Sequence, residues 1–158
     1  MQQMNKPKFV FLFIGDGMGL SQISMAEAYL STLKGEISNE PLSFTKFPVM
    51  GMSTTYSANS YITCSSAAGT ALSTGFKTNN GVLGLDPNGN KLRSISYDIH
   101  NAGFAVGIAS NTTIDHATPA AFYASSSSRN NYYEIAVQIP ATNFEFFGGG
   151  GFLQPNGP

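Results

Sequence analysis

Residues 8–19 read KFVFLFIGDGMG, and this stretch indicates the fold class. Its first seven residues are mostly apolar β-formers, which is typical of a strand buried on both faces in a parallel sheet. The following glycines allow the chain to turn sharply around Asp16. We therefore expect a buried strand over Lys8–Ile14 that delivers Asp16 to one edge of a sheet.

Strand-like and helix-like stretches alternate along the rest of the chain. Further strands are predicted at Val49–Thr55, Phe104–Ala109 and Asn143–Phe147, and helices at Gln22–Lys34, Ser65–Thr74, Ser94–Asn101 and Asn130–Gln138. Ser21 and Thr118 are expected helix N-caps, with Pro119 at the first position of a further helix. This alternation implies βαβ crossovers, and so a three-layer α/β/α fold with a mostly parallel central sheet.

Size and charge restrict the classes of function. The chain has 158 residues, enough for one domain with a sizeable core, and we treat residues 1–158 as part of a single domain. Its net charge is −1 and no basic stripe is present, which argues against a nucleic-acid partner. The apolar run Phe9–Ile14 is too short for a membrane span. A single cysteine, Cys64, rules out an intrachain disulfide.

Three segments are expected to meet where parallel strands end, because ligands of such sheets gather at the carboxyl ends of the strands. These segments are the turn at Asp16, Thr112–His116 and the glycine run that starts at Gly148. A carboxylate flanked by glycines can bind a hard divalent cation or zinc. It can equally be a turn residue that uses its own local hydrogen bonds.

The serine-rich segment at residues 63–75, TCSSAAGTALSTG, has two interpretations. Ser65 at a helix N-terminus lies near free backbone N–H groups, which favour negative charge, and its hydroxyl can attack phosphorus if a metal lowers its pKa. Alternatively, it is only a cap on a buried, alanine-rich helix.

The segment HATPAA at residues 116–121 is followed by Arg129. His116 and Thr118 can ligate or orient a metal, and an arginine fork can take two phosphate oxygens. Each of the three residues also has an ordinary explanation, as a surface histidine, a helix cap and a solvated arginine.

Taken together, GDGMG, TCSSAAGTALSTG, HATPAA with its arginine, and FFGGGG resemble the alkaline phosphatase family in order and spacing, from about Lys8 to Gly151. The resemblance implies a phosphate monoester hydrolase with a phosphoserine intermediate at Ser65 rather than Ser66. It implies two Zn²⁺ and one Mg²⁺, with Asp16 bridging a zinc and the magnesium. It also implies that Ser65 contacts zinc, that His116 and Thr118 line the third metal site, and that Arg129 clamps the phosphoryl oxygens.

The sequence departs from the family pattern at two positions and in its extent. Cys64 stands where many members carry the aspartate that helps to hold the arginine, and we expect a small buried residue there, with a zinc ligand or reactive thiol as alternatives. His116 replaces an aspartate of some bacterial members. The family's other zinc ligands lie in a C-terminal half, so we expect an incomplete N-terminal portion of the catalytic domain that is inactive alone.

The resemblance further implies a periplasmic or secreted protein and a homodimer when full length. Two alternatives remain. One is a related phosphodiesterase or sulfatase, against which the spacing from HATPAA to Arg129 argues. The other is a non-catalytic module that binds phosphate or metal.

Overall fold

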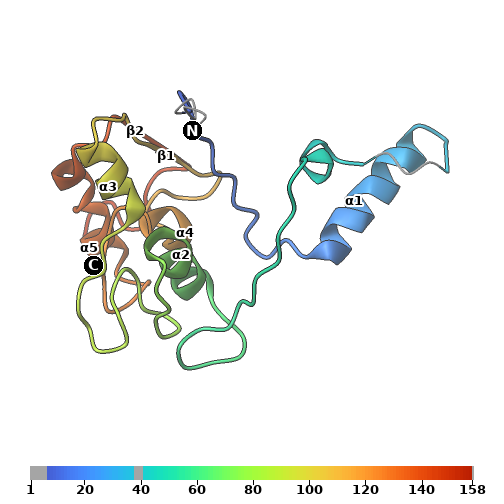
Figure 1. Ribbon diagram of the computed structural model, residues 1–158. Helices are drawn as coiled ribbons and strands as arrows, with labels where there is room; N and C mark the ends of the chain where they lie inside the picture. Colours follow the sequence, from blue (N-terminus) through green and yellow to red (C-terminus); the bar gives the residue numbers. More distant parts are fainter. Residues whose placement is uncertain (1–6, 38–40, 158) are drawn as a thin grey trace, which may run out of the picture. The chain divides into compact units, whose positions relative to one another are not determined.

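The computed structural model describes residues 7–37 and 41–157 and divides the chain into two compact units, residues 1–52 and 53–158. Each unit is described by itself (Figure 1). The first unit contains helix α1, Leu20–Leu33, and a short 3-10 helix, η1, Ser43–Lys46. Helix α1 begins two residues before the predicted start, so Ser21 lies inside it and Gly19 is the N-cap. Gly35 lies just past the end of the helix, as predicted, and has φ +70°, a left-handed conformation that favours glycine there.

The strands predicted at Lys8–Ile14 and Val49–Thr55 are wrong for this structure. Neither segment forms a strand, and the apolar side chains of residues 9–14 are exposed. A strand exists only when its backbone pairs with a neighbour. Within residues 7–37 and 41–157 no backbone hydrogen bond of that kind reaches either segment.

The second unit begins its regular structure with helix α2, Ser65–Thr74, whose bounds agree with the prediction. Gly75 ends this helix in the left-handed conformation with φ +78°, which glycine adopts without steric cost. Helix α3, Ile95–Asn101, is capped by Ser94, whose hydroxyl accepts a hydrogen bond from the Ser96 N–H at 3.2 Å. The predicted helix over 94–101 is therefore confirmed.

A parallel pair of strands organises the rest of the unit. Strand β1, Gly107–Ala109, pairs with β2, Phe146–Gly148, and Ile108 lies opposite Phe147. The crossover between them contains α4 (Ala117–Ala120), α5 (Tyr132–Ala136) and the 3-10 helix η2 (Ile139–Thr142) (Figure 1). The predicted parallel βαβ connection is thus present, with shorter strands and a shorter α5 than expected.

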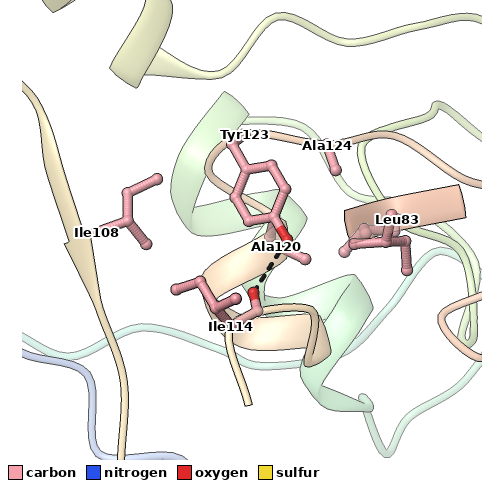
Figure 2. Close-up of a cluster of buried hydrophobic side chains, with 8 residues drawn as sticks. Leu83, Ile108, Ile114, Ala120, Tyr123 and Ala124 are labelled. Atoms are coloured by element: carbon pink, nitrogen blue, oxygen red, sulfur yellow. Dashed lines mark hydrogen bonds between the residues drawn. The ribbon is translucent and has the colours of Figure 1, made fainter. Parts of the chain in front are cut away.

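The core of the second unit fixes the position of α4. Its buried side chains come from β1, from α4 and the residues on both sides of it, from α5 and from the loop at residue 83: Leu83, Ile108, Ile114, Ala120, Ala121, Tyr123, Ala124 and Ile135. The Tyr123 hydroxyl crosses this cluster and donates a hydrogen bond to the Ile114 carbonyl at 3.0 Å (Figure 2). The residues that follow α4 are therefore tied to the segment that leads from β1 into the helix.

Helices α2 and α4 pack closely because small residues face each other. A Cβ added to Gly69 would lie 2.9 Å from the Ala121 Cβ, closer than carbon atoms normally approach. The Ser73 hydroxyl also donates to the Ala121 carbonyl at 2.7 Å. The helix that starts at Ser65 and the helix that follows His116 thus form one packed layer.

Candidate active site

The two serines at the start of α2 differ in accessibility. Ser65 is the first residue of the helix and is partly exposed, and no hydrogen bond involves its Oγ within the described part of the chain. Ser66 is fully buried, and its Oγ lies 3.1 Å from the Cys64 Sγ. A group that attacks a substrate must reach it, so the geometry favours Ser65 over Ser66 as a nucleophile.

Cys64 is a half-buried N-cap with a bonded sulfur, which corrects the expectation of a small buried residue behind the helix. Its backbone N–H donates to Asn80 Oδ1 at 3.0 Å, and its Sγ accepts from the Gly81 N–H at 3.1 Å. The sulfur therefore ties the loop at Gly81 to the start of α2. Burial, the largest influence, raises the pKa of this thiol, but hydrogen bonds from the Ser66 hydroxyl and backbone N–H groups together lower the pKa to about 7.

Alkylation of Cys64 is expected to show this low pKa. The thiolate is the nucleophile, so the iodoacetamide rate should be small below about pH 7 and should rise to a plateau above it. Ser66→Ala removes the hydroxyl that donates a hydrogen bond to the thiolate. The midpoint of the alkylation rate against pH should therefore move to higher pH in this variant. Because Cys64 is the only cysteine, mass spectrometry of the intact chain measures the rate directly. A wild-type midpoint in the ordinary thiol range would contradict the prediction.

Arg129 and His116 contact each other across the start of α4. The Arg129 Nη2 lies 3.1 Å from the His116 Nε2. The Arg129 backbone N–H donates to the Gly81 carbonyl at 2.7 Å. Arg129 is therefore held at its backbone by the loop that also contacts Cys64, and at its guanidinium by His116.

The start of α4 differs from the prediction by two residues. His116 is the N-cap, and Thr118 lies within the helix instead of capping it, with Pro119 after it. Proline is accepted there because the first turn of a helix leaves its N–H groups without intrahelical partners. Thr118 is partly buried and remains one turn or less from His116.

Two of the three predicted strand exits meet. The Gly150 N–H donates to the Thr112 carbonyl at 2.8 Å, and the Ile114 N–H donates to the Gly151 carbonyl at 3.0 Å. A Cβ on Gly149 would lie 3.0 Å from the Thr112 oxygen, so glycine permits this close approach. The glycine run after β2 is therefore paired with the segment that carries His116.

Asp115 is a buried acid that the sequence analysis did not single out. It is 0% exposed, its Oδ2 accepts a hydrogen bond from the Leu153 N–H at 2.8 Å, and its Oδ1 has no hydrogen-bond partner. Burial and then the nearby charge of Asp115 raise the pKa of Tyr123 well above its usual range. An acid directly beside His116 was the available sequence signal.

Asp16 lies in the first unit, in the turn Gly15–Gly19, and is exposed. Its neighbour Gly17 has φ +70°, which explains the glycine there. The expected meeting of Asp16 with the residues around Ser65 remains a prediction, because the two units are described separately.

A family model described as alkaline phosphatase matches residues 7–146. The chain belongs to the alkaline phosphatase family. It is 41% identical over 132 residues to alkaline phosphatase 4 of Bacillus subtilis, a match that covers 80% of this chain and 28% of that protein.

Solved alkaline phosphatases match the fold as well. A cold-active enzyme from a psychrophilic Shewanella species superposes with a TM-score of 0.76 at 34% identity, over 84% of this chain and 33% of that one. A variant of the Antarctic bacterial TAB5 enzyme, described with Mg bound in its M3 site, superposes with a TM-score of 0.71 at 31% identity, over 84% of this chain and 36% of that one. The predicted alkaline-phosphatase-like α/β fold is thus confirmed, and the chain spans about a third of these structures.

The residues that the structure describes supply one good candidate for a metal ligand but no complete metal site. His116 suits the role of one ligand, since its Nδ1 is buried and has no hydrogen-bond partner. Among residues 7–37 and 41–157, however, no three His, Cys, Asp or Glu side chains gather to hold an ion. A complete centre therefore needs further ligands. In the same described ranges, no helix is long and apolar enough to cross a membrane.

Proposed function

We propose that this chain supplies the nucleophile of a phosphate monoester hydrolase and that Ser65 is phosphorylated during turnover. The observation that carries the proposal is the contrast at the start of α2, where Ser65 is accessible and Ser66 is fully buried. The first-turn N–H groups of α2 favour the negative charge of a bound phosphoryl group. Membership of the alkaline phosphatase family supports the same class of reaction.

The proposed reaction has two displacements. The Ser65 Oγ attacks phosphorus, the ester oxygen leaves with a proton as the alcohol, and Ser65 becomes phosphoserine. Water then attacks the phosphoserine, releasing inorganic phosphate and restoring the hydroxyl. Arg129 provides paired N–H donors for the equatorial phosphoryl oxygens, because positioning and electrostatics contribute most of the catalysis of phosphoryl transfer.

Asp16, Ser65, His116 and Thr118 are the residues of this chain that would hold the metals. Two Zn²⁺ and one Mg²⁺, when bound, would neutralise phosphoryl charge and lower the pKa of the serine hydroxyl. His116, with its unpartnered Nδ1, is the best-supported ligand in the second unit. A TAB5 variant in which a histidine is replaced by glutamate has Mg bound in its M3 site, so a magnesium site occurs in a relative of this chain.

We further propose that residues 1–158 form the N-terminal portion of a single catalytic domain. The rest of the protein would contribute the remaining zinc ligands, and the full-length protein would act as a periplasmic or secreted homodimer. The chain spans 28% of the Bacillus subtilis relative and 33% of the Shewanella structure, which supports only the first of these proposals, that residues 1–158 are part of a larger domain.

A comparison of three esters tests the function. The full-length protein with zinc and magnesium should hydrolyse 4-nitrophenyl phosphate. It should leave bis(4-nitrophenyl) phosphate and 4-nitrophenyl sulfate nearly unhydrolysed. The 158-residue chain should release no nitrophenol from any of them, because the part of it that the structure describes holds no complete metal centre. Preferred hydrolysis of the diester or the sulfate ester would replace our proposal with a related hydrolase. Turnover by the 158-residue chain would refute its inactivity, and full-length protein that hydrolyses nothing would favour a non-catalytic binding module.

A further inference from the structure

The side chain of Asn80 makes two hydrogen bonds to the backbone that leads into α2. Its Oδ1 accepts from the Cys64 N–H at 3.0 Å, and its Nδ2 donates to the Ile62 carbonyl at 2.8 Å. A carboxamide has an acceptor and a donor in one plane, and here each meets its complement. Both partners lie within the three residues before Ser65. Asn80 therefore holds this segment at two backbone atoms.

Asn80 is itself held in place by its neighbours. Its backbone N–H donates to the Asn59 Oδ1 at 2.9 Å. The next residue, Gly81, donates to the Cys64 Sγ at 3.1 Å, and its carbonyl accepts from the Arg129 N–H at 2.7 Å. These two consecutive residues are therefore bonded both to the start of α2 and to the backbone of Arg129.

The direction of the Ser65 hydroxyl depends on the backbone in front of it. In the part of the chain that the structure describes, no hydrogen bond involves the Ser65 Oγ, so its position follows from the backbone and one side-chain torsion. Cys64 is the N-cap, with an extended backbone of φ −101° and ψ 167°, and the helix begins directly after it. A bond to the Cys64 N–H thus acts on the residue that orients Ser65.

We propose that Asn80 is a positioning residue for phosphoryl transfer, which sets the Ser65 hydroxyl relative to Arg129. The inference rests on the proposed function, in which Ser65 attacks phosphorus and Arg129 binds the phosphoryl oxygens. The Asn80 carboxamide fixes the backbone in front of the nucleophile, and the adjoining Gly81 fixes the backbone of the arginine. Positioning of this kind matters because a misplacement of about 1 Å can lower a rate about a hundredfold.

A purely structural role of Asn80 predicts a different result. Loss of a structural bond lowers the fraction of folded protein, so phosphorylation and phosphate binding would fall together. Loss of positioning misdirects the Ser65 hydroxyl but keeps the contacts of Arg129. Its backbone remains bonded to the Gly81 carbonyl, and its Nη2 remains 3.1 Å from the His116 Nε2. The rate of phosphorylation should then fall while the affinity for phosphate is kept.

Rapid-quench kinetics of the full-length protein with zinc and magnesium test the proposal. Asn80→Ala removes both side-chain bonds and should slow the burst of 4-nitrophenol from 4-nitrophenyl phosphate roughly ten- to a hundredfold. Inhibition by inorganic phosphate should stay near that of wild type. Asn80→Leu keeps the branched shape without either bond, so it should give the same result and serves if Asn80→Ala does not fold. Thermal unfolding checks that each variant is folded at the assay temperature.

Asn79→Ala is the matched control, because it deletes the same carboxamide one residue away from the two bonds, and its burst should equal that of wild type. An unchanged burst in the Asn80 variants would overturn the proposal. A fall in phosphate affinity in proportion to the burst would overturn it as well, since the role would then be structural.

Peptide mapping of the quenched wild-type protein separates this inference from the function on which it rests. If the phosphoryl group is on Ser65 and the Asn80 variants form it at the wild-type rate, only this inference fails. If Ser65 is not phosphorylated, the proposed function fails, and this inference fails with it. Phosphorylation of Ser65 that is slow only in the Asn80 variants is the expected result.

Discussion

Replacing Ser65 with alanine is expected to reduce monoester hydrolysis by the full-length protein at least about a thousandfold, the scale seen when a covalent nucleophile is removed. Alanine removes the hydroxyl of Ser65, which is the accessible first residue of α2. Ser66→Ala is the matched control, because it deletes the same atom one residue away. Ser66 is fully buried beside the Cys64 Sγ, so this change should lower stability by about 1 kcal/mol while activity persists.

The intermediate itself distinguishes the two serines. Acid quenching during turnover, followed by peptide mapping, should place a phosphoryl group on Ser65 in wild type and in Ser66→Ala. Ser65→Ala should give no phosphopeptide and no burst of released alcohol. A phosphoryl group on Ser66, or a full burst without Ser65, would show that the assignment is displaced by one residue.

Local signals allowed the helices of the second unit to be predicted well. The bounds of α2 depend on small helix-compatible residues and on Gly75, which ends the helix with φ +78°. Both signals lie in the local sequence. The predicted strand at Lys8–Ile14 depends on partners that lie far away in the chain, and its composition alone does not supply them. Within the described residues these partners are absent, so a strand-like sequence stays unpaired.

The candidate site shows the same contrast between local signals, which could be predicted, and long-range contacts, which could not. Residue types identified Ser65, His116 and Arg129 as candidates, because each lies in a short motif. Their relations were not predictable from the motifs. The contact between Arg129 and His116 joins residues 13 apart, and the bond from Gly81 to the Cys64 sulfur joins residues 17 apart. The buried Asp115 accepts a hydrogen bond from the Leu153 N–H, 38 residues further along the chain.

Replacing Arg129 with alanine in the full-length protein should lower kcat/KM for a monoester roughly ten- to a hundredfold, since a hydrogen bond to a charged group contributes about 1.5–3 kcal/mol. The affinity of inorganic phosphate as an inhibitor should fall by the same factor. Arg129→Lys should recover only part of it, because an ammonium is a point charge that lacks the planar pair of donors. Steady-state kinetics with phosphate inhibition measures both effects.

The fold gives a reason to expect that Arg129→Ala acts on binding and leaves folding intact. The bond from the Arg129 N–H to the Gly81 carbonyl at 2.7 Å is made by the backbone and survives the substitution. The His116 Nε2 loses its donor, but the residue as a whole is partly exposed. Thermal unfolding should therefore change little, and a large fall in stability would mean that the guanidinium is mainly structural. Unchanged phosphate inhibition in Arg129→Ala would remove Arg129 from the phosphate site altogether.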